Sequence, residues 1–121
     1  TAYNNIKENK ISFLDFQKLL EKKAKDLDID KKFLGRYLNE NFSGGEKKKM
    51  EILQMLVLDP KFIILDETDS GLDSNSLKKV SKGINNFMDK EKCVLIITHH
   101  KEILDYIKND EIFKIFNKNI I

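Results

Sequence analysis

Residues 62–73 read FIILDETDSGLD, an apolar run that ends in two carboxylates and a short turn. A short continuous apolar run is typical of a β-strand that is covered on both faces. Asp66 and Glu67 stand where this strand runs out, and ligand groups collect beyond the carboxyl ends of strands in open α/β sheets. Taken as an isolated pair, however, the two carboxylates fit the start of a solvated loop better than a site.

Turn and cap signals divide the rest of the chain into alternating helices and strands. Ser12 and Asp73 are predicted N-caps, and Asp59-Pro60 is predicted to stop a helix that begins at Ser43. Helices are predicted over residues 13–27, 31–38, 43–58, 73–90 and 102–107, and strands over 61–65, 93–98 and 111–116. The first helix would bury a stripe made of Phe13, Phe16, Leu19, Leu20 and Leu27. We expect loop over residues 1–10, and a hairpin turn at 117–119 with a return strand.

This order of elements predicts an α/β fold. The second half alternates strand and helix, which favours a sheet with parallel neighbours, and a helical region precedes it. At 121 residues the chain is one domain or part of one.

Composition excludes several classes of protein. The 22 basic and 20 acidic residues leave a formal charge of +2, so no strong field points to nucleic acid or to a membrane surface. No apolar run reaches membrane-spanning length. The only cysteine, Cys93, excludes an internal disulfide and fits a reducing compartment. We expect a soluble, intracellular protein in which Cys93 is a buried strand residue.

A second stretch, NFSGGEKKKM at residues 41–50, places two glycines at a helix start. Ser43 and Glu46 have the spacing of a capping box. That explains neither Gly44 nor Gly45, since an interior helical glycine costs about 1 kcal/mol relative to alanine. Glycine lets a ligand approach the backbone closely, and a helix N-terminus suits an anion such as phosphate. A plain capped helix and an anion site both remain open.

A third stretch, VLIITHHKEILDYI at residues 94–107, carries both histidines. His99 follows the second strand, so we expect it at the same edge of the sheet as Asp66 and Glu67. An imidazole there can donate to a phosphoryl group and stabilise its charge. A capping or surface histidine is the alternative, and His100 is interpreted as a neighbour without a role.

The order of these stretches resembles the ATP-binding-cassette (ABC) ATPase domain, a P-loop NTPase-like fold. FSGGEKK resembles its signature motif, FIILDE its Walker B strand, SGLD its D-loop, and His99 its switch histidine. The resemblance implies ATP and Mg²⁺ as cofactors. It assigns the metal to Asp66, the activation of water to Glu67, and the sensing or stabilisation of the γ-phosphate to His99.

The same resemblance implies a head-to-tail homodimer, in which the signature of one domain covers ATP held by the other. Ser43, Gly44 and Gly45 would contact the partner's nucleotide, together with Asp73 of the D-loop. Glu46 would remain the capping partner of Ser43.

The amino-acid sequence from about Leu27 to Ile121 is still more similar to SufC-like ATPases of the SUF iron–sulfur cluster assembly system. ABC transporters typically read D-E-P-T after Walker B, whereas residues 66–69 here read D-E-T-D. Three positions depart from the usual pattern: Asn41 for glycine, Lys49 for arginine and His100 for tyrosine. This resemblance implies SufB/SufD-like scaffold proteins as partners. Residues 33–40 resemble plastid and cyanobacterial members, which suggests a plastid-type organelle (apicoplast or chloroplast), with the cytoplasm as the alternative.

The phosphate-binding loop G-x-x-x-x-G-K-[ST] is not found in these residues. We therefore expect residues 1–42 to be part of the ABC helical subdomain, and 43–121 to be the signature helix and the C-terminal part of the ATPase core. On this interpretation the fragment alone is inactive and oligomerises through an open strand edge. The alternatives are an ABC transporter or DNA-repair-type ATPase, against which the spelling argues, and a non-catalytic interaction module.

Overall fold

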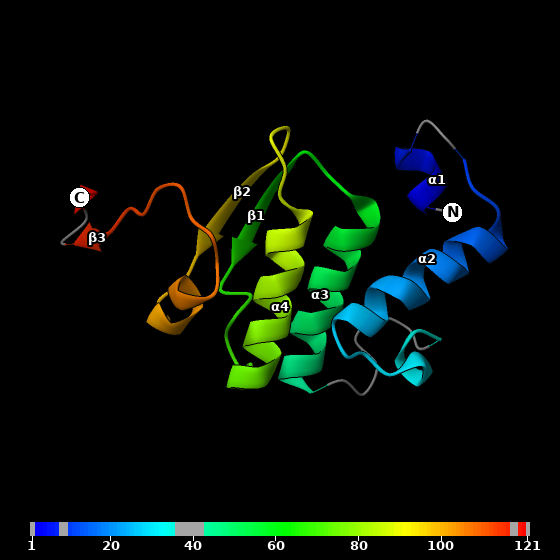
Figure 1. Cartoon of the computed structure of the whole chain (residues 1–121), viewed down its shortest axis with the longest axis horizontal. Helices are drawn as coiled ribbons and strands as arrows, with labels where there is room; N and C mark the ends of the chain where they lie inside the picture. Colours follow the sequence, from blue (N-terminus) through cyan, green and yellow to red (C-terminus); the bar gives the residue numbers. More distant parts are fainter. Residues whose placement is uncertain (1, 8–9, 36–42, 117–118, 121) are drawn as a thin grey trace.

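The computed structural model describes residues 2–7, 10–35, 43–116 and 119–120 (Figure 1). Its α-helices are α1 (Ala2–Ile6), α2 (Phe13–Asp26), α3 (Gly44–Leu58) and α4 (Ser74–Phe87). Two 3₁₀ turns, η1 (Lys31–Phe33) and η2 (Lys101–Asp105), and four strands, β1 (Phe62–Asp66), β2 (Cys93–Ile97), β3 (Ile115–Phe116) and β4 (Asn119–Ile120), complete the described elements. None of the described helices is long and apolar enough to cross a membrane.

Two parallel strands and two helices form the central unit. β1 pairs with β2 in parallel, with Asp66 opposite Ile97, and α4 connects them. Figure 1 shows α3 and α4 side by side against this sheet, with α2 beyond α3. The amino ends of α3 and α4 therefore lie at the same end of the unit as the carboxyl ends of the strands. This mixed arrangement of helix and parallel sheet confirms the predicted fold class.

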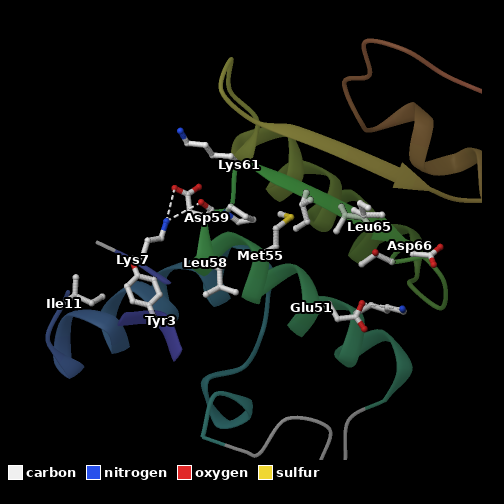
Figure 2. A pocket seen from close by; sticks show the side chains of 15 residues that line it. Tyr3, Lys7, Ile11, Glu51, Met55, Leu58, Asp59, Lys61, Leu65 and Asp66 are labelled. Atoms are coloured by element: carbon white, nitrogen blue, oxygen red, sulfur yellow. Dashed lines mark hydrogen bonds and ion pairs between the residues drawn. The ribbon is translucent and has the colours of Figure 1, made fainter. Parts of the chain in front are cut away.

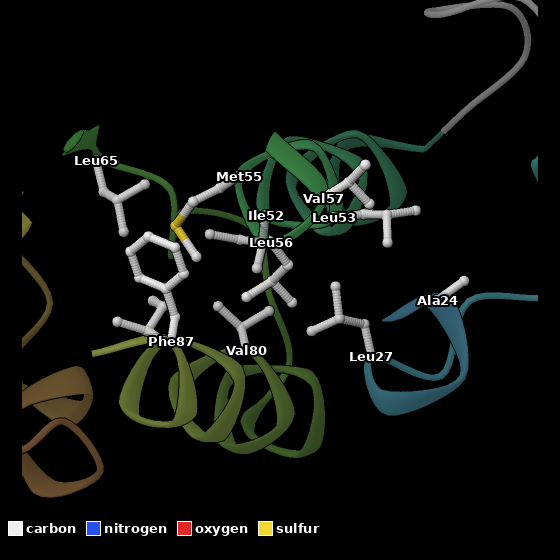
Figure 3. Packing of buried hydrophobic residues seen from close by; sticks show 11 residues of the cluster. Ala24, Leu27, Ile52, Leu53, Met55, Leu56, Val57, Leu65, Val80 and Phe87 are labelled. Atoms are coloured by element: carbon white, nitrogen blue, oxygen red, sulfur yellow. The ribbon is translucent and has the colours of Figure 1, made fainter. Parts of the chain in front are cut away.

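A single hydrophobic core joins α2, α3, α4 and the inner face of the sheet (Figure 3). Leu27 is fully buried between α3 and α4. Gly83 of α4 makes room for it, since a Cβ at that position would lie 3.2 Å from Leu27 Cδ2 and 3.6 Å from Leu56 Cδ1. Any side chain larger than glycine would therefore press on the contact between α2 and α4.

The predicted helix boundaries near caps are confirmed. The Ser12 hydroxyl accepts a hydrogen bond from Asp15 N–H at the start of α2, and Asp73 accepts one from Ser76 N–H at the start of α4. α3 ends at Leu58, and Asp59 takes a left-handed conformation with φ of 48° immediately before Pro60. Side chains close to each helix end fix these boundaries, so the sequence alone was enough to predict them.

Three predictions for short elements are wrong. Residues 2–6 form α1 instead of loop, because the Asn4 amide group bonds both backbone groups of Ile11 and the Tyr3 ring packs on Phe16. The predicted helix 31–38 is only a 3₁₀ turn over Lys31–Phe33, and its residues 36–38 lie outside the described residues. The helix predicted at 102–107 is likewise a 3₁₀ turn, Lys101–Asp105.

The prediction that both strands are covered on both faces is also wrong. Side chains alternate across a strand, and α3 and α4 cover one face only. The other face exposes large apolar side chains: Phe62 (58 %), Ile64 (53 %), Leu95 (47 %) and Ile97 (47 %). Cys93 lies in the same register and is exposed, so its predicted burial is wrong. Phe13, assigned to the buried stripe of α2, is 74 % exposed.

The third predicted strand does not join the parallel sheet. Only Ile115 and Phe116 of residues 111–116 are extended, and they pair antiparallel with Ile120 and Asn119. This pairing confirms the predicted return strand, whereas residues 117–118 of the predicted turn lie outside the described residues. β3 and β4 lie away from β1 and β2 (Figure 1).

Lys92 connects several segments at the end of the parallel sheet where β2 begins. Its Nζ lies 2.8 Å from Asp59 Oδ1 and 3.2 Å from Asp89 Oδ2, and it donates to the Phe87 carbonyl at 3.1 Å. The hydrogen bond to Asp59 is the main reason that the pKa of Lys92 is raised above its ordinary value. The ends of α3 and α4 are thereby held beside the start of β2.

Lys92→Met is expected to lower the free energy of unfolding by about 1 kcal/mol at pH 7, because it removes two half-exposed ion pairs. A raised pKa means that this contribution is complete below the pKa of the unfolded chain and is lost as the pH rises through the folded pKa. Urea unfolding of both proteins should therefore give a constant difference up to about pH 10 and a shrinking one above it. Lys90→Met, at an exposed lysine nearby, is the control. An equal effect of both changes would contradict the assignment.

Candidate functional site

The carboxyl ends of β1 and β2 meet at one edge, and the acidic pair lies there. Asp66 is the last residue of β1, and Glu67 N–H donates to the Ile97 carbonyl at 2.8 Å. Glu67 has a φ of 48°, in the left-handed region that residues other than glycine rarely adopt. Such strain persists only where the surrounding structure enforces it, and it is concentrated at functional sites.

The structure brings Glu67 and His99 together across this edge. His99 Nδ1 lies 3.2 Å from Glu67 Oε1, and both side chains are more than half exposed. In the tautomer that carries its proton on Nδ1, the imidazole donates to the carboxylate. His100, interpreted from sequence as a neighbour without a role, stacks on His99 with ring centroids 4.0 Å apart. Two groups far apart in sequence therefore share one solvent-facing position, while their catalytic roles stay predictions.

Asp66 borders an open groove that runs along α3 and β1 (Figure 2). Asp66 lies at one end of this groove, and Lys7 and Asp59, which interact with each other, lie at the other. The described residues contain no cluster of three or more metal-ligating side chains. Mg²⁺ needs no such cluster when it keeps waters and substrate phosphates as ligands, since one or two protein carboxylates then suffice. The exposed carboxylate of Asp66 fits that requirement.

The second part of the candidate site is the amino end of α3. The predicted capping box is present: Ser43 Oγ accepts from Glu46 N–H at 3.2 Å, and Glu46 Oε2 accepts from Ser43 N–H at 2.7 Å. A pocket of about 450 Å³ opens there, within the usual size range of ligand pockets. Its lining combines the start of α3 with the turn before α4: Ser43, Gly44, Gly45, Glu46, Lys49, Gly71, Leu72, Asp73 and Ser76.

The lining of this pocket carries mixed charge, with Glu46 and Asp73 acidic and Lys49 basic, and the start of α3 adds N–H donors. The amides of Gly44 and Gly45 have no acceptor within α3, because the first N–H groups of any α-helix lack one. Lys49 adds a positive charge to the lining. Asp73 is committed to capping α4, and its pKa is lowered mainly by the hydrogen bond from Ser76 N–H, with Lys49 contributing. Two helix N-termini and one lysine thus border the opening, together with the carboxylates of Glu46 and Asp73.

Gly45 and Gly44 have different surroundings. A Cβ on Gly45 would lie 3.2 Å from the Gly71 carbonyl oxygen, so α3 packs directly on the turn that precedes Asp73. Gly71 itself has a φ of 76°, which glycine adopts without strain. A Cβ on Gly44 would meet nothing within 4 Å. A side chain at Gly45 would therefore force the Gly71 turn to shift by a few tenths of an ångström, whereas Gly44 leaves the helix start open to another molecule.

Sequence reasoning missed Asp69 and Thr98. Thr98 Oγ1 donates to Asp69 Oδ2 at 2.6 Å, which links the turn after β1 to the end of β2. Asp69 is only 5 % exposed. The signal was present in the D-E-T-D spelling of residues 66–69, where a buried carboxylate replaces the last residue of D-E-P-T.

The family model described as "ABC transporter" matches residues 2–70. A probable ATP-dependent transporter ycf16 of Trieres chinensis is 44 % identical, covering 99 % of this chain and 49 % of the relative. The ycf16 protein of Antithamnion sp. is 49 % identical, over 92 % of this chain and 43 % of the relative. A probable ABC transporter ATP-binding protein of Streptococcus pyogenes serotype M3 is 48 % identical, over 94 % and 44 %. The chain spans about half the length of these relatives.

Proposed function

This chain belongs to the ABC transporter family, and we propose that the complete protein is an ABC-type ATPase that serves SUF iron–sulfur cluster assembly. The observation that carries the proposal is the contact between Glu67 and His99 at the carboxyl ends of two parallel strands. Glu67 and His99 resemble the Walker B glutamate and the switch histidine of ABC ATPases. Their proximity supports joint action on one bound triphosphate.

Glu67 is proposed as the general base. Its carboxylate is exposed and accepts a proton from a water that attacks the γ-phosphorus, and the bond from phosphorus to the β–γ bridging oxygen breaks. His99 holds the Glu67 carboxylate in place through Nδ1–H, and its imidazolium form would carry a second N–H, on Nε2, that can donate to the γ-phosphate. Glu67 has a left-handed backbone conformation, and its carboxylate lies beside the His99 ring.

Asp66 is the residue proposed to hold Mg²⁺, through water. The ion supplies charge neutralisation of the β- and γ-phosphates when it is bound. Asp66 would hold the ion at the end of β1, next to Glu67. No other protein ligand is needed from this part of the chain.

The amino end of α3 is proposed to serve a second copy of the protein in a head-to-tail homodimer. Gly44 and Gly45 supply backbone N–H donors, the Ser43 hydroxyl supplies a third group, and Lys49 adds charge. Asp73 caps the adjoining helix and so shapes the rim of this pocket. One dimer would contain two such composite sites. The N-terminal phosphate loop of each site would come from residues outside this chain.

The SUF assignment and its SufB/SufD-like partners rest on the spelling of residues 27–121. A plastid-type compartment is proposed on the likeness of residues 33–40 to plastid members. The relatives are named as an ATP-dependent transporter and an ABC transporter ATP-binding protein, which favours a transporter subunit as the second candidate. A transporter ATPase would couple hydrolysis to membrane subunits instead of a scaffold.

The complete protein, co-expressed with SufB- and SufD-like proteins, is the material for the test. We expect a stable complex on size-exclusion chromatography, ATP hydrolysis that depends on Mg²⁺, and cluster assembly on the scaffold that stops when ATP is withheld. Hydrolysis without scaffold binding would favour the transporter. Scaffold binding without hydrolysis would favour the non-catalytic module.

A further inference from the structure

We propose that Asp69 is a positioning residue for the proposed hydrolysis: through Thr98 it holds His99 in reach of Glu67. This inference rests on the proposed function for its kinetic consequence, although the positioning itself is a property of the fold. Asp69 lies two residues after Glu67, and Thr98 immediately precedes His99. The pair therefore connects the two segments that carry the reacting groups.

The Thr98 hydroxyl is held from both sides. It donates to Asp69 Oδ2 at 2.6 Å and accepts from His100 N–H at 2.9 Å. The first distance is in the range of hydrogen bonds from a hydroxyl to an ionised acceptor, which are the stronger kind. Because residues 98 and 100 are both anchored by this hydroxyl, the backbone of His99 between them has little freedom to turn.

The burial of Asp69 argues for a specific use of its carboxylate. A carboxylate is costly to bury, and it is retained where its hydrogen bonds need it. Thr98 provides the side-chain hydrogen bond that the structure describes for Asp69, and no partner reaches Asp69 Oδ1 among the described residues. A residue kept only to fill space would be better served by an apolar side chain of the same size. Thr98 is thus the side-chain partner of Asp69 among the described residues.

The backbone supports the same arrangement. Glu67 N–H donates to the Ile97 carbonyl at 2.8 Å, and Ser70 N–H donates to the Glu67 carbonyl at 3.1 Å. These bonds hold the loop after β1 at the end of β2, but on the β2 side they reach only Ile97, two residues before His99. The side-chain bond between Asp69 and Thr98 extends the connection by one residue, to the position from which the imidazole projects.

The test uses the complete protein with Thr98→Val, Asp69→Ala and the conservative control Thr98→Ser. Thr98→Val keeps shape and removes the hydroxyl, so we expect kcat to fall about tenfold through misplacement of His99. KM for ATP should change by no more than about twofold, because His99 is one of several groups that would contact the nucleotide. Thr98→Ser restores the hydroxyl and should stay within about threefold of the unchanged protein.

A double-mutant cycle separates positioning from a general structural role. If Thr98 acts through His99, then Thr98→Val in a His99→Ala background should cost less than about twofold further. An undiminished loss in that background, or an unchanged kcat in both, would overturn the inference. Should Asp69→Ala fail to fold, Thr98→Val alone decides the question.

A spectroscopic readout keeps the test independent of activity. The ¹⁵N shifts of the His99 ring, assigned with His99→Gln, report whether Nδ1 remains bonded to Glu67. We expect Thr98→Val to move them toward those of a free imidazole and Thr98→Ser to leave them unchanged. If Thr98→Val leaves the shifts in place, the inference is wrong whether or not the protein hydrolyses ATP. If the shifts move in a protein that turns over no ATP, the proposed function fails and the positioning stands.

Discussion

Glu67→Gln in the complete protein is expected to slow ATP hydrolysis by about 10²- to 10⁴-fold, the usual contribution of a general base. Glutamine keeps the size of the side chain and can still contact His99 Nδ1, but it cannot accept the proton of the attacking water. Nucleotide binding should persist, since the change leaves the other groups of the site in place. Steady-state turnover and equilibrium binding of a fluorescent ATP analogue measure the two effects separately.

Glu91→Gln is the matched control, because Glu91 is an exposed glutamate at the opposite end of β2. It should leave turnover unchanged. Undiminished hydrolysis in Glu67→Gln would remove Glu67 from the role of base. A parallel loss of ATP binding would instead make Glu67 a binding residue.

Gly45→Val is expected to lower hydrolysis by about 10²- to 10³-fold, the range seen when one hydrogen-bond donor to a developing charged oxygen is lost. The added Cβ would lie 3.2 Å from the Gly71 carbonyl, which is backbone and cannot rotate away as a side chain would. The start of α3 must then separate from the turn before Asp73. Its N–H groups would no longer be oriented toward the proposed ligand. Turnover of the complete protein, together with its thermal unfolding midpoint, is the measurement.

Gly35→Val is the control for this change, since a Cβ on Gly35 would meet nothing within 4 Å. It should affect neither turnover nor unfolding. Full activity in Gly45→Val would show that the contact between α3 and the Gly71 turn can relax without consequence for the chemistry. A fall in stability alone, with turnover preserved, would confine Gly45 to a structural role.

Features encoded by neighbouring residues could be predicted from the sequence. The two helix caps each join residues three apart, Ser43 with Glu46 and Asp73 with Ser76. These helix starts could therefore be predicted from the sequence. The shared edge of Glu67 and His99 followed from the parallel order of two strands, which strand–helix–strand alternation indicates. The same argument placed Asp66 at the end of β1.

Features that depend on distant contacts could not be predicted. An apolar strand reads the same whether one face or both are covered, so the exposure of Phe62 and Leu95 was not visible in the pattern. α1 exists through contacts of Tyr3 with Phe16 and of Asn4 with Ile11. The bond between Asp69 and Thr98 spans 29 residues, and no local rule pairs an aspartate with a threonine at that distance.

α3 connects the glycines at its amino end to the strand that carries Asp66. Its 15 residues extend about 22 Å at 1.5 Å per residue, from Gly44 and Gly45 at one end to Leu58 at the other. Only residues 59–61 separate it from β1, whose far end carries Asp66. An α-helix is stiff along its axis, so in the proposed dimer a displacement of the amino end of α3 would be transmitted to the start of β1. The proposed docking and the alignment of the acidic groups would then be coupled through one helix.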